Sequence, residues 1–103
     1  MSIELFVDVT ALAARQIREA EEWWRENRTA APNAVRRELH RAFTLIASQP
    51  RIGGHATNVK LRGVRRIYLP VIKYHLFYHL VSPPEHVEVV ALWHSSRKEG
   101  PPI

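Results

Sequence analysis

Apolar residues recur at helical spacing between residues 11 and 48, and at alternate positions before and after that stretch. A helix is predicted over residues 11–27, "ALAARQIREAEEWWREN", with Thr10 placed to cap it. A second helix is predicted from about residue 32 to residue 48, where Pro50 stops it. The connection is short, so the two helices form an antiparallel hairpin. The apolar faces of the hairpin are Ala13, Ile17, Ala20 and Trp24 in the first helix, and Val35, Leu39, Ala42, Phe43 and Ile46 in the second.

Alternating apolar residues predict four strands, over residues 3–9, 64–69, 74–81 and 86–93. One strand precedes the hairpin and three follow it. The predicted fold class is therefore α+β, with the two-helix hairpin packed on one face of a mainly antiparallel four-stranded sheet. The 103 residues fit a single domain. Because one hairpin covers only one face, apolar positions on the other face, including Phe77, Val90 and Leu92, are expected to need another cover.

The composition is that of a small soluble domain inside a cell. No stretch approaches the ~20 apolar residues of a transmembrane helix. The N-terminal "MSIELFVDV" lacks the basic region of a secretory signal. The chain has no cysteine, which excludes disulfides and thiolate metal sites and fits a reducing compartment. We therefore expect a cytoplasmic protein.

The positive charge is concentrated in the middle of the chain. Residues 1–38 hold six Lys and Arg against seven acids, and residues 85–103 hold two against three, so each part sums to −1. Residues 39–84 contain no Asp or Glu at all. Such a positive field favours a polyanion or an acidic protein segment as partner. The cations of this acid-free segment are Arg41, Arg51, Lys60, Arg62, Arg65, Arg66 and Lys73.

The stretch "VVALWHSSR" (89–97) runs from an apolar strand directly into ionisable and hydroxyl side chains. His94 and Arg97 are candidates for function, because loops at strand ends commonly carry it. The two serines between them do not predict a hydrolase, since no acid is placed to orient His94 and no nucleophile elbow is present. His75 and His79 share one side of a strand but stand about 13 Å apart, too far to hold one metal ion. We expect no metal and no other cofactor.

Five segments stand in a characteristic order: "A..I..A..WWREN", "AP" opening a helix that ends "IASQP", "LRGVRRI", "YHLFYHLV" and "VEVVALWHSSR". In order and spacing they resemble the ParE/RelE superfamily of bacterial toxins, over about residues 3–101. These toxins are the toxic halves of type II toxin–antitoxin pairs. The resemblance implies a helical hairpin on a mainly antiparallel sheet, which agrees with the element order above. It also implies a cognate acidic antitoxin as partner and no membrane association.

The superfamily divides by target. RelE-like members cleave mRNA on the ribosome, whereas ParE-like members are associated with inhibition of DNA gyrase. RelE-like nucleases carry an Arg in a strand where this chain reads "YHLFY", so His75 stands at that place. Some relatives have an acid or base at the position of His94. The glutamate base of others would come from the segment after the second helix, where this chain has no acid.

Three hypotheses follow. The first is a ParE-like toxin that binds DNA gyrase and is not an enzyme, with Arg65, Arg66, His94 and Arg97 as target-binding candidates. The second is a RelE-like, metal-independent endoribonuclease acting on mRNA at the ribosome. Its catalytic candidates are His94, Arg66, Arg97, His75 and Tyr78. The third is a non-toxic binding module that retains only the fold.

The antitoxin is expected to lay an amphipathic, acidic segment across the sheet face that the hairpin leaves open. Its carboxylates would meet arginines of the acid-free segment, while its apolar side chains cover the sheet. Trp23 is a further contact candidate, because adjacent tryptophans on a helix cannot both face the core. The antitoxin-binding candidates are Arg62, Arg65, Phe77, Val90, Leu92 and Trp23.

Overall fold

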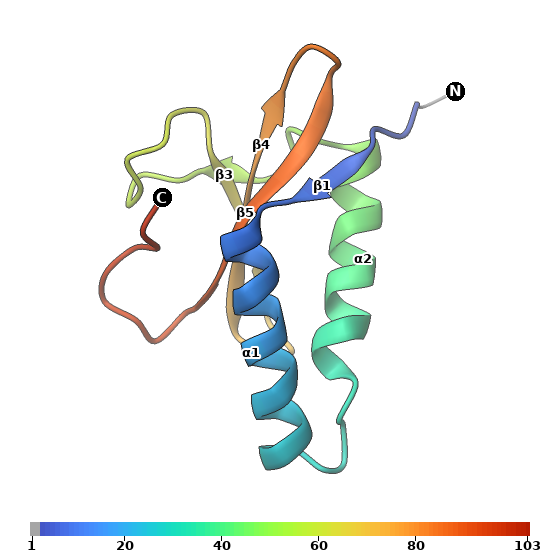
Figure 1. Cartoon of the computed structure of the whole chain (residues 1–103), viewed down its shortest axis with the longest axis vertical. Coiled ribbons are helices and arrows are strands. Elements are labelled where there is room, and N and C mark those ends of the chain that lie inside the picture. The colour runs from blue at the N-terminus through green and yellow to red at the C-terminus, as the bar shows by residue number, and fades with distance from the viewer. Residues whose placement is uncertain (1–2) are drawn as a thin grey trace.

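The computed structural model describes residues 3–103, as a helical hairpin and one open sheet (Figure 1). The sheet order is β1-β5-β4-β3-β2; β1 runs parallel to β5, and every other neighbouring pair is antiparallel. The elements, in chain order, are β1 (Val7–Val9), α1 (Ala11–Asn27), α2 (Ala34–Ser48), β2 (Gly54–His55), β3 (Arg65–Leu69), β4 (Tyr74–Val81) and β5 (His86–His94). The predicted α+β class, with the hairpin on one face of a mainly antiparallel sheet, is confirmed.

The sheet has five strands where four were predicted. The additional strand is β2, whose two residues pair with Arg65 and Arg66 from a segment that reads as a loop. The first strand is also shorter than residues 3–9, because it begins at Val7. Before it, the Leu5 amide donates to the Ala47 carbonyl at the end of α2, at 2.9 Å, and the Phe6 carbonyl accepts from the Val87 amide of β5 at 2.9 Å, so this segment connects the end of α2 to the sheet.

Both helices end where local hydrogen bonds close them. The Thr10 hydroxyl accepts from the Ala13 amide at 3.2 Å and caps α1 as predicted. The Arg28 amide donates to the Trp24 carbonyl at the other end. Helix α2 begins at Ala34, two residues later than predicted, with Asn33 as its N-cap residue.

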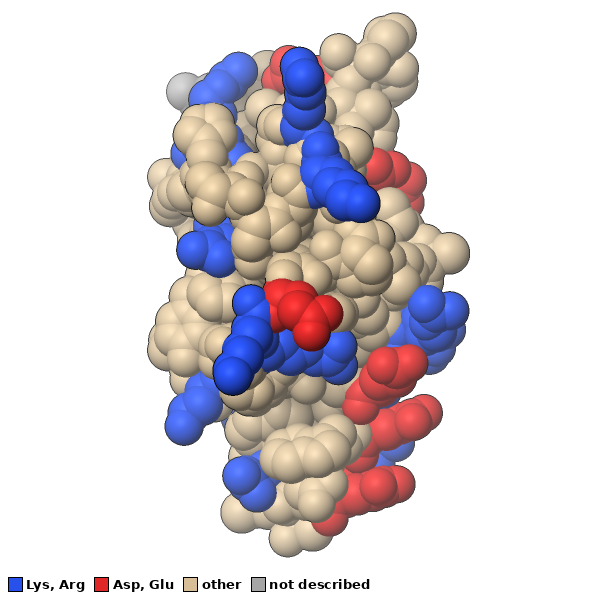
Figure 2. All heavy atoms as spheres, turned by 90° about the vertical axis from the view of Figure 1, so that its left-hand side faces the viewer, with Lys and Arg blue, Asp and Glu red and all other residues tan. Residues whose placement is uncertain are grey.

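The sheet face opposite the helices is covered by the chain itself. Val64, Phe77, Val90 and Ala91 form a small apolar cluster there. The loop after β2 and the C-terminal segment lie over it, on the left of Figure 1, and contribute partly buried Ala56, Val59 and Ile103. Figure 2 views this side and shows basic side chains spread over it, with acidic ones along the right-hand edge and also among the basic ones near the middle.

The prediction that Phe77, Val90 and Leu92 leave the second face open is therefore wrong. Phe77 and Val90 do lie on that face, but they are 0% and 3% exposed. Leu92 lies in the other core, because β5 carries a bulge: Phe77 pairs with Ala91 and Tyr78 with Val89, so Val90 has no counterpart. The extra residue reverses the alternation of side chains beyond it.

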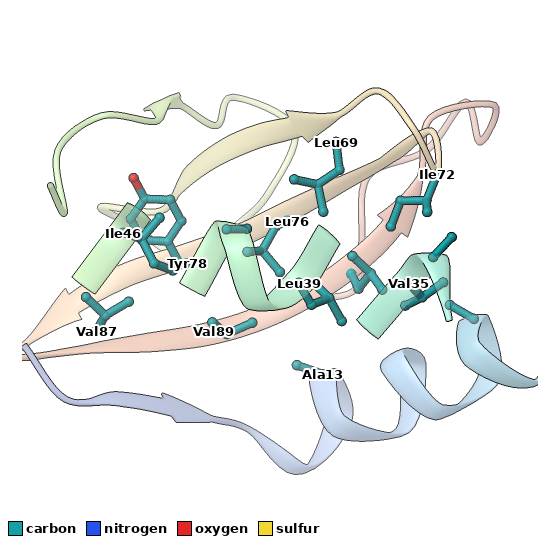
Figure 3. Packing of buried hydrophobic residues seen from close by; sticks show 14 residues of the cluster. Ala13, Val35, Leu39, Ile46, Leu69, Ile72, Leu76, Tyr78, Val87 and Val89 are labelled. Atoms are coloured by element: carbon teal, nitrogen blue, oxygen red, sulfur yellow. The ribbon is translucent and has the colours of Figure 1, made fainter. Parts of the chain in front are cut away.

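The main core lies between the helices and the sheet (Figure 3), and Tyr78 is its largest buried side chain. The Tyr78 ring is 0% exposed, and its hydroxyl accepts from the Gly53 amide at 2.9 Å. Burial raises the pKa of Tyr78, while the Gly53 hydrogen bond and the Arg65 charge oppose that rise. A methyl group on Gly53 would meet the Tyr78 hydroxyl and the Arg66 carbonyl. This contact therefore fixes the loop between α2 and β2 to the core.

Tyr78→Phe should lower the free energy of unfolding by about 1–3 kcal/mol, because it leaves the buried Gly53 amide without an acceptor. Urea unfolding followed by circular dichroism measures the difference. The matched control is Tyr68→Phe, which removes a hydroxyl from a side chain that is 48% exposed and should change stability by less than about 0.5 kcal/mol. Equal effects of the two substitutions would contradict the structural role of the Tyr78 hydroxyl.

Candidate functional site

The end of β5 brings His94 against Tyr74 of β4. The two residues are paired across the strands, and their rings meet edge to face with centroids 4.9 Å apart. The backbone amide of Ser96 donates to Nδ1 of His94 at 3.1 Å, and the Ser96 hydroxyl lies 2.7 Å from the same atom. Since a backbone amide can only donate, Nδ1 is an acceptor, and the neutral ring carries its proton on Nε2. The turn after β5 thus sets the tautomer of His94.

The same turn holds Arg97. Its guanidinium carbon lies 4.0 Å from the centre of the Trp93 ring, a cation–π contact. Nε1 of Trp93 donates to the Glu99 carbonyl at 2.7 Å, and the Ser95 amide donates to the Lys73 carbonyl at 2.9 Å. His94 and Arg97 therefore lie close together, on a turn that is hydrogen-bonded to Lys73 and to Glu99.

Two hollows open beside His94, each of about 400 Å³, and they share Trp23, Tyr74 and His94. We call the first, of about 420 Å³, the tryptophan hollow; its lining is Trp23, Trp24, Arg28, Val71, Ile72, Lys73, Tyr74 and His94. The second, of about 410 Å³, is the arginine hollow, which Arg15, Arg97 and Glu19 line together with α1 and the end of β5. Burial raises the pKa of Tyr74, Arg97 lowers it and Glu19 raises it, so charges of the arginine hollow act on the shared ring.

The five nuclease candidates do not converge on one place. Tyr78 is fully buried, with its hydroxyl bonded to Gly53. His75 and Arg66 lie on the opposite sheet face, where Arg66 pairs with Phe77 and His75 with Tyr68. His94 and Arg97 stand at the strand end on the helix side. The three groups are separated by the sheet or enclosed in the core, so they cannot surround one phosphate.

The surroundings of His75 disfavour the charged form of its ring. Its Nδ1 is buried and, within residues 3–103, has no hydrogen-bond partner. Its ring packs against Tyr68 and Phe77, with centroids 5.0 and 6.3 Å away. Burial lowers the pKa of His75, and the Arg66 charge lowers it further.

The remaining candidates are spread over the surface. The Arg65 guanidinium donates to the carbonyls of Arg51 (3.2 Å) and Gly53 (2.8 Å), which occupies part of its donor set. Arg62 is exposed in the loop before Gly63. Trp23 is 44% exposed, as the adjacent tryptophans predicted.

Sequence reasoning missed a groove between α2 and β3, here called the β3-edge groove, of about 450 Å³. β2 pairs only with Arg65 and Arg66, so among the residues that the structure describes no strand flanks the outer edge of residues 67–69. The sequence signal for this groove was the presence of the apolar residues Ile52, Tyr68 and Val71, but their spacing along the chain does not show that they lie close together in the fold. The apolar and aromatic lining is Ala42, Leu45, Ile52, Ile67, Tyr68, Leu69, Pro70 and Val71.

Residues 3–103 contain no cluster of three or more His, Asp or Glu side chains able to hold a metal ion. None of the helices in the same range combines the length and apolar character that crossing a bilayer requires.

Comparison with known proteins points to one family. The model of the family described as "ParE toxin of type II toxin-antitoxin system, parDE" matches residues 7–99. Among solved structures, a chain of the chromosomal ParDE toxin–antitoxin system from P. aeruginosa superposes with a TM-score of 0.70 at 14% identity, over 90% of this chain and 98% of that chain. At that identity the likeness is one of fold. No curated protein matches the sequence.

The pKa of His75 should lie below its usual value near 6.5, and proton titration of its ring by NMR measures it. Arg66→Gln should raise this pKa by removing the nearby charge, whereas Arg62→Gln, in the exposed loop, is the matched control and should not. Because the folded-state pKa is the lower one, His75 contributes stability that is present above pH 6.5 and is lost as pH falls through the folded-state pKa. A His75 that titrates at or above 6.5 would contradict its burial.

Proposed function

Because the chain belongs to the family of ParE toxins of type II toxin–antitoxin systems, we propose that it stops growth by binding DNA gyrase, and that a cognate antitoxin neutralises it. In this proposal the protein acts as an inhibitor and not as an enzyme. Its site of action on gyrase is the end of β5, and the antitoxin occupies the β3-edge groove.

The observation that carries the proposal is the separation of the nuclease candidates. Cleavage of RNA needs a base, an acid and a cation around one phosphate. Here Tyr78 is enclosed in the core, and His75 stands on the sheet face opposite His94. A binding surface has no such requirement, because its residues act through contact area and charge.

The surface at the end of β5 has the composition of a protein-binding hot spot. Such hot spots are enriched in Trp, Tyr and Arg that line well-packed pockets. Trp23 and Tyr74 line both hollows, and the Arg97 guanidinium lies over the Trp93 ring in the lining of the arginine hollow. The side chains of Arg97 and His94 are already held by Trp93 and by Ser96, so they lose little conformational entropy on binding. Both are suited to a partner surface that carries carboxylates.

In a supercoiling assay with purified gyrase, the wild-type toxin should inhibit, and His94→Ala/Arg97→Ala should raise the half-inhibitory concentration about tenfold or more. The matched control is Arg37→Ala/His40→Ala, which removes one arginine and one histidine from exposed positions on α2 and should inhibit like the wild type. Cleavage of ribosome-bound mRNA, with supercoiling unaffected, would support the endoribonuclease hypothesis instead.

The β3-edge groove fits an extended segment of an acidic antitoxin. The open edge of residues 67–69 offers backbone groups for an added strand, and Ile52, Tyr68 and Val71, each about half exposed, offer apolar contacts. The Arg41 side chain lines the groove and is 77% exposed. The groove-lining acid in the described chain, Glu38, is 9% exposed and pairs with Arg41 at 3.7 Å. The exposed charge at the groove is therefore positive, which complements carboxylates.

Calorimetric titration with the C-terminal segment of the antitoxin should show a heat-capacity decrease and weaker binding at high salt. Ile52→Glu should weaken binding more than about tenfold, because it removes apolar contact and places a carboxylate opposite an acidic segment. The matched control is Leu61→Glu, an exposed residue outside the groove, which should bind like the wild type. Equal losses in the two variants, or binding without salt dependence, would contradict the groove as the antitoxin site.

A further inference from the structure

The tryptophan hollow has an unusually aromatic wall. Trp23 is 44% exposed and stands edge to face with Trp24, with ring centroids 6.1 Å apart. Tyr74 and His94 belong to the same lining and form a second edge-to-face pair. Helix α1 thus presents two indole rings to a hollow that β4 and β5 line with a phenol and an imidazole. A flat ligand can stack in such a hollow, since aromatic faces bind planar rings.

The charge of the hollow has one sign. Arg28 and Lys73 are its charged lining residues, and none of the described residues that line it is acidic. The Arg28 guanidinium carbon lies 5.1 Å from the Trp23 ring centre and 5.9 Å from that of Trp24, so the cation sits over the aromatic wall. The site therefore combines flat surfaces with positive charge at short range.

The backbone of Lys73 is strained, and two hydrogen bonds hold it in that conformation. Its φ of 64° lies in the left-handed region that side chains other than glycine rarely adopt. Its amide donates to the Leu69 carbonyl at 2.8 Å, and its carbonyl accepts from Ser95 at 2.9 Å. Strain of this kind persists where surrounding contacts over-determine it, and it clusters at ligand sites. The two hydrogen bonds fix the backbone of Lys73 at the wall of the hollow.

We infer that the tryptophan hollow binds a nucleotide unit, with its base stacked on Trp23 and its phosphate held by Arg28 and Lys73. Its volume of about 420 Å³ falls within the range of about 300–1,000 Å³ typical of small-ligand sites. Stacking platforms beside positive charge are the usual means of binding nucleotides without sequence preference. The unit is either a free nucleotide or part of a single strand. A strand can continue into the arginine hollow, where Arg15 and Arg97 supply further cations.

The tryptophan hollow shares Trp23, Tyr74 and His94 with the surface proposed to bind gyrase, but the inference is tested without gyrase and can hold or fail independently of that proposal. An acidic peptide shares the negative charge of a nucleotide but not its planar base, so the contribution of the Trp23 ring separates the two ligands. Nonspecific electrostatic attraction to the basic chain is distinguished by a control variant that loses the same number of positive charges from another surface.

The test uses the full chain and fluorescence anisotropy of a labelled single-stranded oligothymidylate, in competition with AMP, ATP or an unlabelled acidic peptide. Trp23→Ala should weaken oligonucleotide binding by roughly 5- to 150-fold, the factor that stacking on one aromatic ring contributes. Trp23→Phe keeps a ring and should restore most of the affinity. Arg28→Ala/Lys73→Ala should weaken binding and reduce its salt dependence, compared with the charge-matched control Arg36→Ala/Arg37→Ala on α2.

Competition by AMP or ATP that depends on Trp23 supports a free nucleotide as ligand, and binding of the oligonucleotide alone supports a single strand. Equal losses of affinity in Arg28→Ala/Lys73→Ala and in Arg36→Ala/Arg37→Ala, with no effect of Trp23→Ala, would overturn the inference in favour of nonspecific electrostatic attraction. Competition by the acidic peptide but not by nucleotides would overturn it in favour of a protein ligand. Thermal melts of each variant verify that the fold is intact, and the conservative Trp23→Phe variant provides a folded comparison if Trp23→Ala is unstable.

Discussion

Val90 is one residue more than the ladder between β4 and β5 requires, and the candidate site depends on it. Strict alternation from Val89 would place His94 on the same sheet face as His75. The bulge instead turns His94 toward Tyr74 and helix α1, while Trp93 falls under the C-terminal segment. A strand-end site that also uses the helical hairpin exists only because of this local irregularity.

The acid-free segment is wound around the sheet, so its charge reaches several surfaces. Arg65 and Arg66 are neighbours in β3 and project to opposite faces, one beside the buried Tyr78 and the other beside His75. Lys73 reaches the tryptophan hollow, and Arg41 lines the β3-edge groove. The positive charges are contiguous in the sequence but lie on several surfaces of the folded chain. They can support several contacts with acidic partners and do not form a single anion site.

The sequence patterns predicted both helices, the three long strands and the hairpin on one sheet face, because these depend on periodicity within each segment. They could not predict β2, whose two residues are defined by distant pairing, or the bulge at Val90, which has no local composition signal. The cover of the second face was also missed, since Val59 and Ile103 read as loop and tail. His94, Arg97 and Trp23, which were selected from their positions in the sequence, lie at the two hollows, and their roles remain predictions. The hollow that Trp23 and His94 share, with Lys73 beside them, could not be foreseen, because it joins three elements far apart in the sequence.

The outer edge of β3 has a consequence for the protein in isolation. Long exposed edges with apolar neighbours act as templates for intermolecular sheet growth, and proteins usually blunt them with charge, proline or a covering segment. Here β2 shields Arg65 and Arg66, and Pro70 follows directly after the strand, but the edge of Tyr68 carries no such protection within residues 3–103. Two copies that met at this edge could extend each other's sheets. A segment that paired with this edge would therefore also cover the backbone groups that the chain leaves open at Tyr68.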